Sequence, residues 1–221
     1  MMGTIGEFLE VPASPKSLRK RKLLFGVGVN DAWYTVHVNV KGKVVRCPYY
    51  RRWANMLSRT HCDKTRKRRP DYVGSYLHKD WLAFSVFREW MEKQDWRGKA
   101  LDKDIIRPGN KEYGPDTCCF VTNKVNSLLL DNISAGSEWP RGVTASKSGR
   151  FTACCAVDGK SVNLGTFDSP DEASQAYRVA KYRLLMEAAS GCGDEVVAKG
   201  LRGHAGLVLR GETTKSGGND E

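Results

Sequence analysis

ALDKDIIRPGNKEYGPDTCCFVTNKVNSLLL, residues 100–130, decides how the first part of this chain is expected to fold. Apolar, β-favouring residues predict a strand over Leu101–Ile106, and the Gly, Pro and Asn residues that follow it are typical of turns. A second strand is predicted over Cys118–Val121. A helix then opens at Thr122, a residue type that often caps helices, and apolar residues follow it at helical spacing. The stretch therefore predicts strand, turn, strand and helix in close succession.

Polar side chains are left over by this pattern, and they come from each part of the stretch. Carboxylate and amide oxygens are the ligands that hard divalent cations prefer in proteins. Such an ion can activate water and stabilise charge on a phosphoryl group. The stretch is thus a candidate site for a divalent cation. The residues concerned are Asp102, Lys103, Asp104, Asn110, Asn123 and Asn126.

The order of DxD, GNK and CCFVTNKVN within residues 102–126 resembles the HNH, or ββα-metal, nuclease motif. The match runs through Asn110 in the loop and Asn126 on the helix. The resemblance implies an Mg²⁺ or Mn²⁺ ion held by Asp102, Asp104 and Asn126. The general-base histidine of that family is missing here, and on a one-residue shift Lys103 or Asp104 occupies its position. The candidate catalytic residues are Asp102, Lys103, Asp104, Asn110 and Asn126.

The chain of 221 residues has a formal net charge of +11, which favours an anionic partner such as nucleic acid. From Arg46 to Arg69, nine Lys or Arg residues stand against one Asp. Residues 49–59 fit an amphipathic helix, and a basic loop is predicted over Lys64–Arg69. Contact with phosphate is the favoured interpretation, and a solvated basic surface is the alternative. The candidate DNA contacts in this region are Arg51, Arg52, Arg66, Lys67, Arg68 and Arg69.

WPRGVTASKSGRFTACCAVDGKSVNLGTFDSPDEASQAYRVAKYR, residues 139–183, predicts a small sheet followed by a helix. The Asp158-Gly159 pair is a favoured hairpin turn. The helix is expected to begin at Ser169 or Pro170, because Ser is a good N-cap and Pro suits the first turn. The three expected strands are Arg141–Ala145, Arg150–Val157 and Lys160–Phe167.

Four motifs in this stretch resemble those of the AP2 DNA-binding domain. They are Arg141-Gly142-Val143, Gly149-Arg150-Phe151, Leu164-Gly165-Thr166-Phe167 and Asp171-Glu172-Ala173. In that family the sheet enters the major groove, which is wide enough for a β-ribbon. The base preference of the family is not transferred, because Phe151 stands where the family often has Trp. The resemblance implies DNA contact by Arg141, Thr144, Lys147, Arg150, Thr152 and Asn163.

An HNH-like unit followed by an AP2-like unit resembles the phage-borne, free-standing homing endonucleases, and the likeness covers about residues 26–185. It implies hydrolysis of double-stranded DNA and no small-molecule substrate. Because the base histidine is missing, a sequence-specific DNA-binding protein without catalysis stays open as the main alternative. A third interpretation is an interaction protein that acts through its aromatic residues.

The predicted fold class is α+β. A flexible basic arm at 1–22 precedes an HNH-like domain at 23–130, which begins with a hairpin over 24–45 and contains a helix over 79–93. A linker at 131–138 leads to an AP2-like domain at 139–189, built from three strands and a helix. The Gly-rich tail at 190–221 is expected to be partly disordered or to add a short strand.

No run of eighteen apolar residues occurs, so no membrane span is predicted. The first residues lack the pattern of a secretory signal, and the seven cysteines are typical of reduced thiols rather than of a disulfide framework. We therefore expect the cytoplasm, that of the host cell if the chain is phage-encoded. A structural zinc ion is a minor alternative for Cys47, His61, Cys62 and His78, which lack paired zinc-site spacing.

Overall fold

The computed structural model describes residues 8–129 and 138–212. It combines helices with small sheets, which confirms the α+β class in its coarse form. Its described part contains three two-stranded sheets and one three-stranded sheet. The described chain divides into two compact units. Unit 1 comprises residues 8–96 and 111–116, and unit 2 comprises residues 97–110, 117–129 and 138–212. The predicted linker at 131–138 lies outside the described residues, apart from Glu138.

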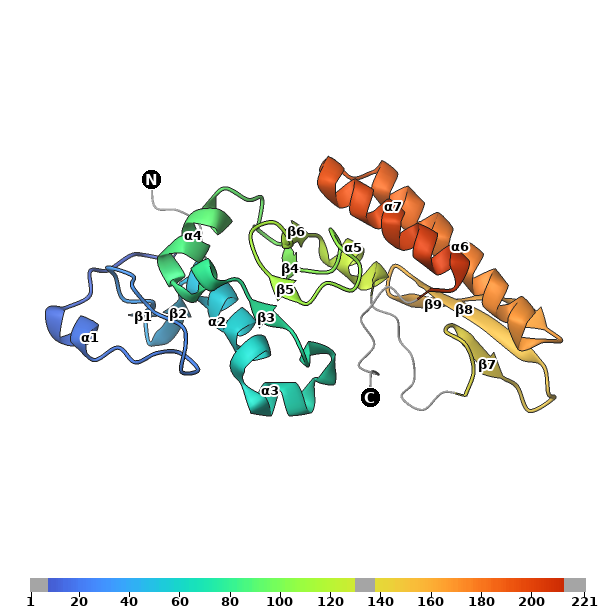
Figure 1. Cartoon of the computed structure of the whole chain (residues 1–221), viewed down its shortest axis with the longest axis horizontal. Helices are drawn as coiled ribbons and strands as arrows, with labels where there is room; N and C mark the ends of the chain where they lie inside the picture. The colour runs from blue at the N-terminus through green and yellow to red at the C-terminus, as the bar shows by residue number, and fades with distance from the viewer. Residues whose placement is uncertain (1–7, 130–137, 213–221) are drawn as a thin grey trace. The chain divides into compact units, whose positions relative to one another are not determined.

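Unit 1 contains short helices and two small strand pairs (Figure 1). Strands β1 and β2 form an antiparallel hairpin, and β3 pairs in parallel with β5. The hairpin is shorter than the one predicted over 24–45. The elements are α1 Pro15–Arg19, β1 His37–Val40, β2 Lys43–Arg46, α2 Pro48–His61, α3 Asp63–Arg68, η1 Pro70–Tyr72, β3 Tyr76–Leu77, η2 Lys79–Leu82, α4 Phe84–Glu92 and β5 Glu112–Tyr113.

The core of unit 1 is aromatic. Trp53, Trp81, Phe84 and Phe87 are each at most 1% exposed. The indole N–H of Trp53 donates to the Trp81 carbonyl at 2.7 Å, which satisfies the one polar atom of that buried ring. The predicted helix at 49–59 is confirmed as α2, and its apolar side supplies this core.

The helix predicted over 79–93 is wrong at its start, where the chain forms the 3₁₀ turn η2 and only then α4. Val29 lies beside Ala83 as an isolated parallel bridge. The Val29 N–H donates to Leu82 O at 2.8 Å, and its carbonyl accepts from Phe84 N–H at 3.0 Å. Because these main-chain groups bond to a distant segment, they cannot continue a helical ladder. Helix α4 therefore begins one residue after Ala83.

The predicted basic loop at Lys64–Arg69 is also wrong, because most of it is helix α3. Asp63 lies in the first turn, and Arg66, Lys67 and Arg68 lie in the last turn. This order places negative charge at the positive end of the helix and positive charge at the negative end, which stabilises even a short helix.

The described part of the predicted flexible arm is bound to unit 1. The guanidinium of Arg21 donates to the carbonyls of Asn30, Ala32 and Tyr34. Pro12 lies beside Tyr34 in an isolated antiparallel bridge. Residues 8–22 therefore form part of the folded unit.

Unit 2 begins with an antiparallel pair, β4 Ala100–Asp102 and β6 Cys119–Val121, in which Leu101 faces Phe120. Helix α5, Asn123–Leu128, follows at once. The Thr122 hydroxyl accepts from Val125 N–H at 3.2 Å, so the predicted N-cap is confirmed. The first strand predicted over 101–106 ends at Asp102, because the chain turns there.

The sheet predicted in the second half of the chain is confirmed as β7 Val143–Ala145, β8 Phe151–Val157 and β9 Lys160–Phe167, in the order β7-β8-β9. Helix α6, Pro170–Ser190, lies along this sheet, and the Ser169 hydroxyl caps it. Asp158 and Gly159 both have positive φ angles, which matches the predicted hairpin turn.

The predicted Gly-rich tail contains a helix, α7 Glu195–Arg210, which runs alongside α6 (Figure 1). The Asp194 carboxylate accepts from Val196 and Val197 N–H and so caps its start. Val197, Leu201 and Val208 are buried in a cluster with Leu185 and Ala189 of α6. The expectation of disorder or a strand is therefore wrong for residues 195–210, because apolar burial outweighs the low helix propensity of glycine.

We predict that Gly142→Ala destabilises unit 2 by about 3 kcal/mol. Gly142 has a φ of +74°, and an added Cβ would lie 2.1 Å from the ring of Tyr177 on α6. The left-handed backbone costs about 1 kcal/mol for alanine, and the overlap adds roughly 2 kcal/mol. Hydrogen exchange of amides in β8 and α6 measures the change.

Gly149→Ala is the matched control, since Gly149 has a φ of +78° but nothing within 4 Å of its added Cβ. Only the backbone cost of about 1 kcal/mol is expected there. If Gly142→Ala and Gly149→Ala lowered the stability by the same amount, the packing of Gly142 on Tyr177 would be contradicted.

Candidate functional site

The turn after β4 brings together four of the predicted site residues: Asp102, Lys103, Asp104 and Asn110. We call this group the Lys103 turn. One carboxylate oxygen of Asp102 accepts from Asp104 N–H at 2.7 Å and from Ile105 N–H at 2.9 Å. Burial, and then the negative charge of Asp104, raise the pKa of the Asp102 carboxyl. The Asp102 carboxylate is thus used to shape the backbone.

Lys103 is the most buried charged group of this turn, with 6% of its surface exposed. Its ammonium donates to Asp104 Oδ1 at 2.6 Å and to the Asn110 carbonyl at 2.6 Å. The Asn110 amide in turn donates to the Lys103 carbonyl at 2.8 Å. The two sides of the turn are therefore closed by bonds in both directions.

Asn126, the predicted helix ligand, lies half-buried on α5. Among the described residues, no hydrogen bond links its side chain to Asp102 or Asp104. In the described ranges, no group of three or more His, Cys, Asp or Glu side chains is placed to hold a metal ion, and this includes the four candidates for zinc. The carboxylates of Asp102 and Asp104, as they are arranged here, do not form a site for a divalent cation, because the Lys103 ammonium already neutralises Asp104. Binding of Mg²⁺ or Mn²⁺ stays a prediction.

A histidine does lie against this turn, but it comes from α7 and not from the motif. The Nε2–H of His204 donates to the Asp104 carbonyl at 2.8 Å. The residue is 1% exposed, and its Nδ1 atom has no hydrogen-bond partner in the described structure. Burial lowers the pKa of this imidazole. His204 is thus held as a neutral ring that fastens α7 to the turn.

Gly200 lies one helical turn before His204 and lets α7 approach closely. A Cβ at Gly200 would lie 2.2 Å from the Ile105 carbonyl oxygen. The i, i+4 spacing of Gly200 and His204 within an apolar helical pattern was the available sequence signal. It was missed because the segment was predicted as tail.

The three-stranded sheet has one buried and one exposed face. Val143 and Ala153 pack with Ala173 of α6 on the buried face. The opposite face carries a row of threonines, because Thr144 pairs with Thr152 and Thr152 pairs with Thr166. The sequence predicted Thr144 and Thr152, and the strand register adds Thr166.

Arg150 borders this threonine row. Its guanidinium bonds to Asp168 at 2.8 Å and to the Thr166 carbonyl at 3.2 Å. Lys147 is exposed in the turn between β7 and β8, and Arg141 is half-buried. Asn163 is exposed, but its side-chain oxygen accepts from Gly165 N–H at 2.8 Å. The six predicted residues thus lie on or around one small sheet. They differ in how exposed they are and in whether their side chains already bond within the protein.

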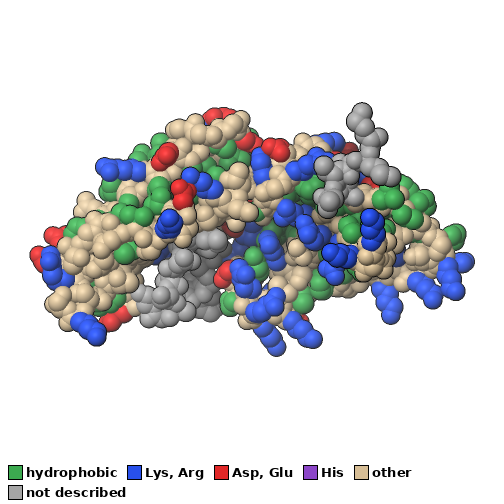
Figure 2. Space-filling model, turned by 180° about the vertical axis from the view of Figure 1, so that it is seen from behind, with side chains coloured by type: hydrophobic (Ala, Val, Ile, Leu, Met, Phe, Trp, Pro, Cys, Tyr) green, Lys and Arg blue, Asp and Glu red, His purple; other side chains and the backbone are tan. Residues whose placement is uncertain are grey.

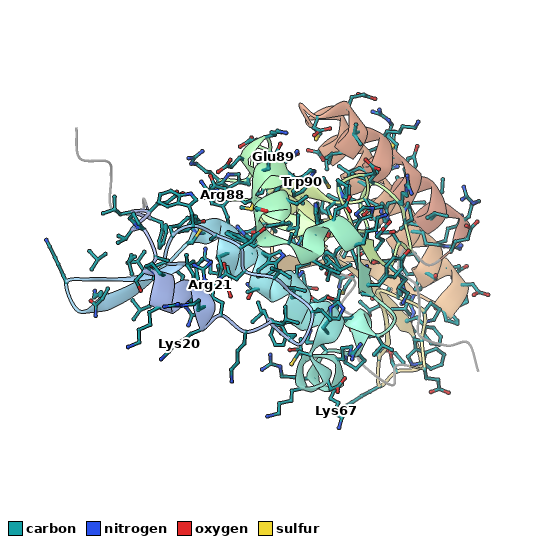
Figure 3. The ribbon with its side chains drawn as sticks, turned by 60° about the vertical axis from the view of Figure 1, so that its left-hand side comes forward. Lys20, Arg21, Lys67, Arg88, Glu89 and Trp90 are labelled. Atoms are coloured by element: carbon teal, nitrogen blue, oxygen red, sulfur yellow. The ribbon has the colours of Figure 1, made fainter. Side chains whose placement is uncertain are left out.

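Unit 1 carries a separate basic surface on α2 and α3, where Figure 2 shows Lys and Arg side chains gathered. Lys67 and Arg68 are exposed, and neither has an ion-pair partner among the described residues. Lys67 points away from the ribbon in Figure 3. Arg66 instead bonds to Asp63 at 2.6 Å, and Arg69 lies 3.7 Å from Asp71.

The charges on α2 are crowded. Burial, and then repulsion by Arg51 and Arg59, lower the pKa of the Arg52 guanidinium. Arg51 is exposed and Arg52 is half-buried. Neighbouring like charges gain when an anion approaches, so this surface suits phosphate.

The chain matches no protein-family model, no curated protein and no solved structure. In the part of the chain that the structure describes, the helices are too short or too polar to cross a membrane.

We predict that Gly200→Ala loosens α7 from the Lys103 turn and lowers local stability by about 2 kcal/mol, since the added methyl overlaps a backbone oxygen. Hydrogen exchange at the Ile105 amide, which is bonded to Asp102, measures the effect.

Gly203→Ala provides the control on the same helix, because nothing lies within 4 Å of a Cβ there. Replacing this glycine should stabilise α7 by roughly 0.5–1 kcal/mol. If the Ile105 amide exchanged more slowly than in the wild type in both variants, the close approach of α7 to the Ile105 carbonyl at Gly200 would be contradicted.

Proposed function

We propose that this protein binds double-stranded DNA through the exposed face of the β7-β8-β9 sheet. The observation that carries the proposal is the row of Thr144, Thr152 and Thr166 across three strands, bordered by Arg150. Helix α6 packs on the other face, so these side chains project from a firm support.

The chemistry of this face suits the major groove. Threonine hydroxyls donate to or accept from base edges, and threonine methyls contact the methyl group of thymine. Arginine recognises guanine or phosphate through several N–H groups. Arg150 is already held by Asp168, which fixes the direction of its guanidinium and leaves half of its side chain exposed. The sheet would thus supply the sequence preference.

The basic surface of unit 1 would supply affinity without sequence preference. Lys67 and Arg68 project from α3, and Arg51 projects from α2. Each phosphate that such a group neutralises releases counterions, which favours binding to any duplex. Phosphate contacts position a protein on DNA, whereas base contacts select the site.

Arg150→Ala should weaken binding to the preferred duplex about tenfold, because it removes a charged contact at the edge of the exposed face of the β7-β8-β9 sheet. The slope of log K against log salt concentration should fall by roughly 0.9 if Arg150 contacts a phosphate. Fluorescence anisotropy over a salt series, on duplexes selected from a random pool, measures both quantities.

Lys199→Ala is the charge-matched control, because Lys199 is exposed on α7, which packs against α6. Its affinity and salt slope should equal those of the wild type. If Arg150→Ala and Lys199→Ala behave alike, the sheet is not the reading surface.

Metal-dependent DNA cleavage, of the homing-endonuclease type, is the second candidate. The order β4, β6, α5, with Asp102 at the end of β4, favours it because it is the order that the HNH resemblance implies. Cleavage would require the Lys103 ammonium to leave Asp104, so we expect it to be slow.

Wild-type protein and Asp104→Ala, each incubated with supercoiled DNA and Mg²⁺ or Mn²⁺, test this candidate. Nicking by the wild type that Asp104→Ala abolishes would support it. Intact DNA with both proteins, or equal nicking by both, would rule out this site while leaving DNA binding untouched.

A further inference from the structure

The Lys103 turn holds a buried cation of its own. The Lys103 side chain is 7% exposed, whereas that of Asp104 is 29% exposed. An ammonium removed from water loses much hydration free energy, which only close, well-placed oxygens can offset. Lys103 has such oxygens in the Asp104 carboxylate and the Asn110 carbonyl, both at 2.6 Å.

We propose that the Lys103 ammonium takes the place of a divalent cation in this turn, and that the oxygens around it form a latent cation site. Carboxylate and main-chain carbonyl oxygens are the donors that hard divalent cations prefer. The distance of 2.6 Å lies at the upper end of the range for Ca²⁺ and is longer than the 2.0–2.1 Å of Mg²⁺. An ion in place of the amine would need only a small contraction of these groups.

The rest of the turn would remain when the amine is removed. The Asp102 carboxylate still holds Asp104 N–H and Ile105 N–H. The Asn110 amide still donates to the Lys103 carbonyl, a main-chain atom that any residue supplies. The His204 ring still bonds to the Asp104 carbonyl from α7. Three sets of bonds, none of which uses the ammonium, therefore hold the main chain on both sides of the turn, from which the Asn110 carbonyl and the Asp104 side chain project.

In the natural protein this turn should need no divalent ion, whether or not the protein binds DNA. Because the turn is neutralised by a covalently attached cation, the stability of unit 2 should not depend on divalent ions. A second cation at the same place would meet the positive charge of Lys103 and be repelled.

The experiment compares full-length wild type with Lys103→Ala, and uses Mn²⁺ as the probe because the signal of the free ion in electron paramagnetic resonance falls on binding. Lys103→Ala should bind one Mn²⁺ ion per chain, at least tenfold more tightly than the wild type. The thermal unfolding temperature should rise with Mn²⁺ in Lys103→Ala and stay unchanged in the wild type.

Two controls locate the ion. Lys103→Ala/Asp104→Asn should lose the added Mn²⁺ binding, since it removes the carboxylate charge. Lys103→Ala/Asp171→Asn, which changes an exposed carboxylate on α6, should keep it.

Several outcomes would overturn the proposal. They are equal Mn²⁺ binding by wild type and Lys103→Ala, or binding by Lys103→Ala that persists when Asp104 is changed. If Lys103→Ala does not fold alone, recovery of its circular dichroism on adding Mn²⁺ supports the proposal, and failure to recover overturns it.

Discussion

The carboxylate of Asp102 accepts two successive main-chain N–H groups, and unit 2 is organised around that turn. These bonds end β4 and turn the chain away from the strand direction. The turn leaves the Asp104 carbonyl open to His204 and the Ile105 carbonyl against Gly200. Strand, turn and C-terminal helix are thus joined at one point, and the buried side of Ile105 continues into the core between α6 and α7.

The two units differ in charge and in the surfaces that they expose. Between Lys16 and Arg69 the sequence has sixteen Lys or Arg residues and only two Asp. In unit 2, the exposed sheet face is polar, and its Arg150 is paired with Asp168. The basic surface of unit 1 suits general electrostatic attraction to phosphates, and the polar sheet face of unit 2 suits selective hydrogen bonding to bases. The proposed DNA binding uses both properties.

Local patterns predicted those elements whose causes lie within a few residues. The boundaries of β9, the caps at Thr122 and Ser169 and the Asp158-Gly159 turn agree with the structure because each depends on neighbouring side chains. The start of α4 was predicted wrongly, since the bonds that displace it come from Val29, more than fifty residues earlier. The Gly-rich composition after residue 190 concealed α7, whose stability comes from burial against α6.

In the candidate site, too, the sequence predicted what depends on neighbouring residues and not what depends on distant ones. The sequence predicted Asp102, Lys103 and Asp104 within a strand and Asn110 in the turn after it, and all four stay in one region because residues so close along a chain cannot separate far. It did not show the direction of the Lys103 side chain, which turns inward to Asp104 and Asn110. Nor did it show His204, one hundred residues away from Asp104. Only the packing of α7 brings that ring to the turn, because side-chain burial and long-range contact depend on how elements meet in three dimensions.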